Sequence, residues 1–172
     1  LYYEMYQLWR KVEGLPVPPL LFSKGSRYIP DREKAIMSAA CAKYVQLFNG
    51  AGLCMFGAFV GAHRLPLFDW LNAAAGGDNP PDGYLPMGAA LQTLKQAFNI
   101  KQGIDPRRNK PSARALGLPT LAKGANKDRR VDLDNMIRDY WRQFGWDGDT
   151  GLPPEDVLQQ LAAETHLGCE AE

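Results

Sequence analysis

The chain has 172 residues, 45% of them hydrophobic and 23% charged, which is typical of a globular protein and excludes a disordered or fibrous one. Its 20 lysines and arginines exceed its 19 aspartates and glutamates by one, so charge gives no reason to expect nucleic acid or an anionic membrane as a partner. No apolar run approaches the ~18 residues of a membrane-spanning helix, and the first residues do not form a signal peptide. We therefore expect a cytoplasmic protein.

The first 30 residues predict the end of a preceding helix followed by a linker. Residues 1–11 carry a helical apolar stripe, and residues 14–30 contain too many glycines and prolines for regular structure. A Lys-Gly-Ser-Arg stretch at 24–27 lacks the spacing of a phosphate-binding loop and is interpreted as a solvated loop. Residues 31–167 are predicted to form a helical domain, and residues 168–172 a frayed acidic tail.

The most strongly patterned helix is predicted from Asp31 to about Gly50, with Asp31 as its N-cap. Its apolar positions recur at steps of three and four: Ile36, Met37, Ala40, Cys41, Tyr44, Val45 and Phe48. Because Gly50 and Gly52 adopt positive φ easily, the helix should end there and Leu53-Cys54 should turn back toward the helix's packing partner.

Two helices are expected next. Pro66 is predicted to start a short helix with Asp69 in its first turn, and residues 76–81 a clear break. A longer helix should follow, with Asp82 as N-cap and a stripe that we interpret as core: Tyr84, Met87, Leu91, Leu94 and Phe98. His63 is interpreted as a surface or satisfied core residue rather than a catalytic base.

Residues 99–130 are predicted to be a loop, and they are basic. They contain Lys101, Arg107, Arg108, Lys110, Arg114, Lys123, Lys127, Arg129 and Arg130. Such a run is usually a solvated face or linker, and the functional alternative is a docking patch for an acidic protein.

The last two helices are predicted from Asp132 or Asp134 to Gly145, and as a short helix that starts at the proline pair at 153–154. Because no stretch shows sustained alternation with β-branched residues, we expect an all-α fold: an irregular bundle of about four to six helices with long Pro/Gly-rich joins. Three cysteines, at 41, 54 and 169, cannot all pair and show no Cys-x-x-Cys spacing, which argues against a disulfide framework or a self-contained zinc site. Cys169 is interpreted as incidental.

Three segments resemble, in order, motifs of the tungsten-dependent aldehyde:ferredoxin oxidoreductase family. Residues 49–54, Asn-Gly-Ala-Gly-Leu-Cys, are similar to its Asp-x-x-Gly-Leu-Cys motif. Residues 98–103 are similar to its Phe-Asn-x-Arg-x-Gly segment, and residues 140–161 to its Gly-Trp-Asp, Gly-x-Pro, Leu-x-x-Leu ending. The chain departs from the family's acidic pair and Leu-Pro-x-Arg at residues 107–114. We take the chain for the C-terminal part of such an enzyme.

The resemblance implies an intact enzyme that oxidises aldehydes to carboxylic acids at a tungsten or molybdenum ion held by two pterins, with a [4Fe-4S] cluster and ferredoxin or a similar electron carrier as acceptor. It implies that Cys54 is the fourth cluster ligand, and that Asn49, Gly52 and Leu53 contact the pterin. Asn49 replaces the usual aspartate, so it keeps an acceptor oxygen but loses the negative charge. The implied partner is the N-terminal pterin-binding domain of the same enzyme.

The family's other three cluster cysteines, in a Cys-x-x-Cys-x-x-x-Cys motif, do not occur in these 172 residues. We therefore expect the fragment alone to bind no cluster or pterin and to be inactive. The alternative is a stand-alone helical interaction module in which Cys54 is a small core residue. Nucleic-acid binding is disfavoured, because the basic run lacks interleaved aromatic residues.

Overall fold

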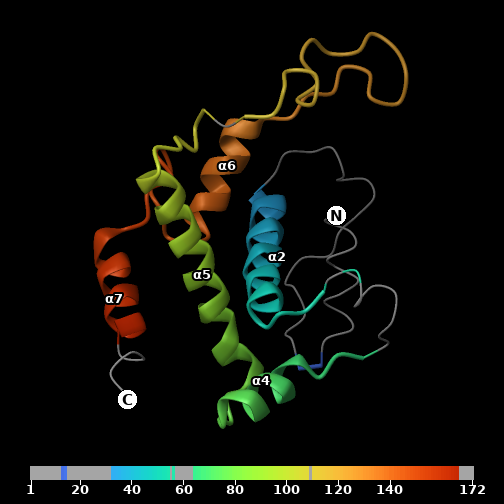
Figure 1. Cartoon of the computed structure of the whole chain (residues 1–172). Coiled ribbons are helices and arrows are strands. Elements are labelled where there is room, and N and C mark those ends of the chain that lie inside the picture. The colour runs from blue at the N-terminus through green and yellow to red at the C-terminus, as the bar shows by residue number, and fades with distance from the viewer. Residues whose placement is uncertain (1–12, 15–31, 55, 57–63, 109, 167–172) are drawn as a thin grey trace. The chain divides into compact units, whose positions relative to one another are not determined.

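The structure is a computed structural model, and it describes residues 13–14, 32–54, 56, 64–108 and 110–166. Five helices lie in this part of the chain (Figure 1): α2 (Arg32–Gly50), α4 (Leu67–Ala75), α5 (Pro81–Lys101), α6 (Leu133–Arg142) and α7 (Glu155–His166). Within it there is no β-strand beyond isolated bridges. The predicted all-α fold with four to six helices is confirmed.

The chain divides into two compact units, and the division passes through α2 and α5. The described part of unit 1 is residues 13–14, 37–54, 56 and 64–92, and that of unit 2 is residues 32–36, 93–108 and 110–166. The predicted boundaries after residues 30 and 167 lie outside the described residues. The organisation into linker, helical domain and tail therefore stays a prediction, as do the expectations for Asp31, His63 and Cys169.

The core of unit 1 is built on the apolar stripe of α2, as predicted. Tyr44 is completely buried, and its ring lies 5.8 Å from that of Phe48. The cluster also takes side chains from the start of α4 and from α5; its buried members are Cys41, Tyr44, Leu47, Phe48, Leu65, Leu67, Phe68 and Tyr84. This core fixes the C-terminal end of α2.

Within unit 1, α2 and α5 lie side by side (Figure 1), and they meet where α5 has no side chain. A Cβ atom at Gly88 would lie 2.2 Å from the carbonyl oxygen of Lys43 and 3.2 Å from Cγ of Leu47. Beside this contact, the Gln46 amide donates a hydrogen bond of 2.7 Å to the Gln92 side-chain oxygen. Gly88 therefore permits an approach of the two helices that no other residue allows.

The prediction for α5 was wrong in two respects. The helix begins at Pro81, so Asp82 lies in its first turn and is not the N-cap; proline suits the first helical position because its missing N–H is not needed there. Of the predicted core stripe, only Tyr84 is buried. The other four are exposed, with exposed fractions of 54, 38, 36 and 62% for Met87, Leu91, Leu94 and Phe98. They share one face of α5, and the described residues do not cover that face.

The core of unit 2 gathers around two tryptophans. Trp146 is buried, its ring stacks on that of Phe144 at 4.7 Å, and its indole N–H donates to the Thr93 hydroxyl at 3.1 Å. Trp141 is also buried, and its ring lies against Gly151, where a Cβ would be 2.7 Å from Cε2. These contacts join the last turns of α5 to α6 and to the turn before α7.

The starts of α6 and α7 agree with the sequence. Asp132 is the N-cap of α6, because its carboxylate accepts from the backbone N–H of Asn135 at 3.4 Å. This decides between the two predicted caps, Asp132 and Asp134. The proline pair at 153–154 directly precedes the first residue of α7, Glu155, as predicted.

Asp147 stabilises the turn between α6 and α7. One carboxylate oxygen accepts from the Thr150 hydroxyl, from the Thr150 backbone N–H at 2.7 Å and from the Asp149 N–H at 3.1 Å. These hydrogen bonds hold the pKa of Asp147 below its ordinary value, and the bond from the Thr150 hydroxyl makes the largest contribution to this shift. The stabilisation is therefore present above the unfolded pKa of about 4, and it is lost as the pH falls through the folded pKa.

We expect Asp147→Asn to flatten the dependence of the urea midpoint on pH below about pH 4, because the variant no longer has this carboxylate to protonate. The measurement is urea unfolding, followed by circular dichroism, over a series of acidic buffers. Asp78→Asn, which removes an exposed carboxylate in unit 1, is the matched control and should follow the wild-type profile. An Asp147→Asn profile that parallels the wild type would contradict the role of this carboxylate.

Candidate functional site

Asn49, Gly52, Leu53 and Cys54 lie together in the turn that ends α2. The backbone N–H of Leu53 donates to the Phe48 carbonyl at 3.1 Å, and that of Gly52 donates to the Asn49 carbonyl at 3.0 Å. Gly52 has φ of +71°, and together these features form the Schellman arrangement of a helix C-terminus. The predicted capping by glycine is confirmed, and the turn has a defined geometry.

The turn separates its side chains into an anchor and two exposed groups. Leu53 is half-buried and packs against the core of unit 1, whereas Asn49 and Cys54 are exposed. A Cβ at Gly52 would meet no atom within 4 Å, so the space beside the backbone is open there. The alternative interpretation of Cys54 as a core residue is wrong for the described structure, in which the core thiol is Cys41.

Exposed apolar side chains lie close to this turn. Phe56, two residues after Cys54, is 73% exposed. On α5, Cδ1 of Leu91 would lie 3.5 Å from a Cβ at Gly50, so the exposed face of α5 reaches the end of α2 within unit 1. An amide, a thiol and uncovered apolar surface therefore occur together at one place.

The two described thiols differ in availability, and neither forms a disulfide. Cys41 is 7% exposed, and burial raises its pKa to about 11. In the metal-free protein carrying Cys169→Ser, we expect iodoacetamide at about pH 8 to label exposed Cys54 roughly 100-fold faster than Cys41, because the thiolate is the reacting species. Peptide mass spectrometry measures both rates, and Cys54→Ser is the control for the faster site. Equal rates would contradict the burial of Cys41.

The two other family-like segments end helices in the same way as residues 49–54. The N–H of Ile104 donates to the Asn99 carbonyl at 3.0 Å, and the N–H of Trp146 donates to the Trp141 carbonyl at 3.1 Å. Each turn has a glycine of positive φ, Gly103 or Gly145. The glycine of every motif therefore has a structural reason. The turn at 49–54 does not, however, require asparagine at 49 or cysteine at 54.

Within the described residues, no group of three or more histidine, cysteine, aspartate or glutamate side chains could hold a metal ion. None of the helices described is both long and apolar enough to cross a membrane.

Sequence reasoning missed one element of this region, the uncovered face of α5. The three- and four-residue spacing of Met87, Leu91, Leu94 and Phe98 identified an apolar face, but it carried no signal of what packs on it. The close approach of α5 at Gly88 was missed too, because glycine within a helical pattern predicts only a weaker helix.

Comparison with known proteins places these features in context. The family model described as "Aldehyde ferredoxin oxidoreductase, domains 2 & 3" matches residues 4–162. The chain is 33% identical over 135 residues to the tungsten-containing aldehyde ferredoxin oxidoreductases of Pyrococcus abyssi and Pyrococcus horikoshii, a match that covers 78% of this chain and 22% of each relative. It is also 33% identical over 118 residues to that of Pyrococcus furiosus, covering 69% of this chain and 19% of the relative. The chain thus spans about a fifth of the length of the curated relatives that it matches.

Proposed function

Because this chain belongs to the aldehyde ferredoxin oxidoreductase family, we propose that it is the C-terminal helical part of a tungsten (or molybdenum) pterin enzyme that oxidises aldehydes to carboxylic acids with ferredoxin as electron acceptor. Its role is to supply the fourth cysteine of a [4Fe-4S] cluster and contacts to the pterin. The observation that carries this proposal is the exposure of Cys54 and Asn49 on a turn whose geometry is set by Gly52 and Leu53.

Cys54 fits the role of a cluster ligand. Its thiol is exposed, and a soft thiolate is the ligand that cluster iron prefers. Leu53, the residue before Cys54, packs against the core, and the backbone hydrogen bonds of the turn fix the path of the chain to Cys54. A ligand held in this way loses little conformational freedom on binding. When bound, the cluster would supply one-electron transfer to the acceptor.

The pterin contacts are assigned to the other three residues of the turn. The open space beside Gly52 lets a planar ring approach the backbone without meeting a side chain. The exposed Asn49 amide offers a carbonyl oxygen as acceptor and an NH₂ group as donor. In this proposal, Leu53 contributes its backbone to the pterin and its side chain to the core.

The uncovered face of α5 supports the proposal that a pterin-binding domain of the same enzyme packs against this chain. Its four exposed apolar side chains repeat along one face of a 21-residue helix, which is the pattern of a helix packed on one side. Since Leu91 adjoins the end of α2, a domain seated on this face would lie next to Asn49 and Cys54. Burial of this face would exclude water beside the cofactor.

The test is iron and visible-absorption analysis of the full-length protein, produced without oxygen, as wild type and as Cys54→Ala. We expect the variant to lose the iron–sulfur absorption and to keep its circular dichroism spectrum, because a cubane lacking one of four thiolates is not retained. Cys41→Ala is the matched control and should keep its iron. A Cys54→Ala protein with a full iron content would overturn the assignment.

The isolated fragment offers one thiolate in the proposed site and none of the family's other three cluster cysteines. We expect no aldehyde-dependent reduction of a viologen dye by the purified fragment, and turnover would contradict this expectation.

The cytoplasmic location also stays a prediction.

A further inference from the structure

The connection between α5 and α6, residues 102–131, concentrates positive charge on the chain. This segment, which we call the basic loop, contains eight lysines and arginines and two aspartates, a net charge of +6. The whole chain has a net charge of +1, so the rest of it carries −5. Residue 109 is the one position of the loop outside the described residues.

The basic loop has a defined backbone. The N–H of Leu118 donates to the Ala113 carbonyl at 2.8 Å, and the N–H of Val131 donates to the Leu116 carbonyl at 2.9 Å. Between them, Gly117 has φ of +78°, and a Cβ there would lie 2.4 Å from the carbonyl oxygen of Arg129. The loop therefore folds back on itself, which brings the segment around Arg114 beside the segment around Arg129.

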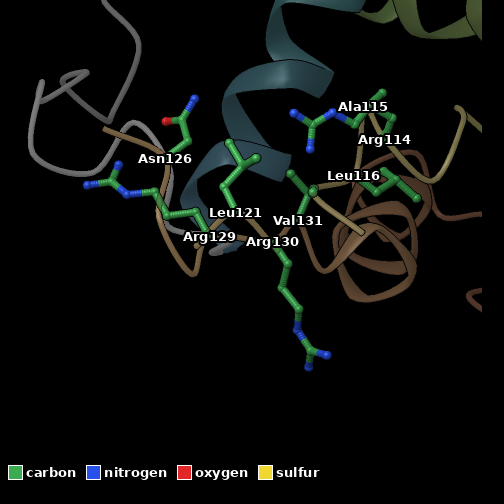
Figure 2. A pocket seen from close by; sticks show the side chains of 9 residues that line it. Arg114, Ala115, Leu116, Leu121, Asn126, Arg129, Arg130 and Val131 are labelled. Atoms are coloured by element: carbon green, nitrogen blue, oxygen red, sulfur yellow. The ribbon is translucent and has the colours of Figure 1, made fainter. Parts of the chain in front are cut away.

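The fold-back forms an open pocket of about 280 Å³ with apolar and charged lining. Leu116, Leu121 and Val131 supply the apolar part. Arg114, Arg129 and Arg130 supply the charge, and Figure 2 shows that their side chains extend in different directions and do not converge on one point. Such a site does not enclose a single small anion. It suits a broad surface that brings several carboxylates and one apolar side chain.

Part of this charge is not balanced within the described residues. Asp105 pairs with Arg107 and Arg108, at 3.1 and 3.5 Å, and Lys110 pairs with Asp134. Among the described carboxylates, none lies within ion-pair distance of Arg114, Lys123 or Arg130. These cations remain available to charges on another molecule.

From this charge and geometry, we propose that the basic loop docks an acidic protein partner, an electron carrier that receives the electrons. The identification of this partner as an electron carrier depends on the proposed function. An acidic surface on the partner would be attracted by several cations of the basic loop, and this attraction would speed the encounter of the two proteins and set their relative orientation. Nucleic acid fits less well, because residues 102–131 contain no aromatic side chain on which a base could stack.

The test uses the full-length protein and a purified [4Fe-4S] ferredoxin of net negative charge, with binding measured at about 50 and about 200 mM NaCl. We expect Arg114→Gln/Arg130→Gln to weaken binding about tenfold at the lower salt concentration and to reduce the salt dependence. Arg114→Lys/Arg130→Lys keeps the charge and should bind within about threefold of wild type. Arg32→Gln/Arg64→Gln removes two exposed charges outside the loop and should also leave binding nearly unchanged.

Wild-type binding by the Arg114→Gln/Arg130→Gln protein, or equal weakening by the control pair, would overturn the proposal. Tighter binding of a duplex DNA, dependent on the same two arginines, would overturn it in favour of nucleic acid. Because the readout is binding and the circular dichroism spectrum checks folding, this result is independent of the iron content of Cys54→Ala. A failure of docking with the cluster intact would leave the proposed function standing.

Discussion

Gly88→Ala is expected to lower the free energy of unfolding by about 2 kcal/mol or more. The added methyl group would lie 2.2 Å from the Lys43 carbonyl oxygen and 2.9 Å from its carbon, both backbone atoms of α2 that cannot rotate away. The helices must therefore move apart, which opens the buried core beneath them. Alanine is intrinsically better than glycine in a helix by roughly 0.5–1 kcal/mol, but this gain is smaller than the loss from overpacking.

Gly83→Ala is the matched control for Gly88→Ala. It adds the same methyl group to the same helix, but its nearest neighbour is Cδ of Pro80 at 3.7 Å, an ordinary contact. We expect it to stabilise the protein by a few tenths of a kcal/mol up to about 1 kcal/mol. Urea unfolding followed by circular dichroism measures both variants. Changes of the same sign would show that Gly88 is not at a close helix contact.

Gly151→Ala should be more damaging, by about 3 kcal/mol or more, because two effects add. Gly151 has φ of +71°, where a residue with a Cβ is strained by roughly 1–2 kcal/mol. The Cβ would also lie 2.7 and 2.8 Å from two atoms of the buried Trp141 ring. Overpacking of this kind typically costs a further 1–3 kcal/mol.

Gly145→Ala separates these two effects. Gly145 has φ of +72° but no atom within 4 Å of its Cβ position, so this variant should show the backbone strain alone. A second check is Gly151→Ala in a Trp141→Leu background, where the smaller side chain should remove much of the extra loss. Thermal and urea unfolding of the wild type, Gly145→Ala, Gly151→Ala, Trp141→Leu and the double variant measures the difference. A Gly151→Ala loss no larger than that of Gly145→Ala would contradict the contact with Trp141.

Apolar periodicity was sufficient to predict which helix face is buried wherever the described residues include the elements that pack on that face. The stripe of α2 is buried because α4 and α5 supply its partners, and the N-cap and proline signals placed α6 and α7 correctly. The same spacing in α5 predicted a core that the described residues do not contain. The spacing of apolar residues identifies an apolar helix face, but the element that packs on it depends on contacts with residues distant in the sequence or on another domain.

The candidate site was predictable in its local part. Glycines at 50 and 52 indicated the end of α2, and the order of hydrogen bonds there follows from the local sequence. The exposure of Cys54 was not predictable, because its apolar neighbours are typical of a core. The fold-back of the basic loop was not predictable either, since it depends on the contact of Gly117 with Arg129, twelve residues away.

The exposed face of α5 also determines how these 172 residues would behave if produced alone. Water would then contact four apolar side chains of this face: Met87, Leu91, Leu94 and Phe98. Pairing with the same face of a second copy would remove this apolar surface from water, which is favourable. Concentrated samples of the chain alone would therefore self-associate and, at higher concentration, precipitate. If the proposed pterin-binding domain covers this face, co-expression with that domain should keep the chain soluble.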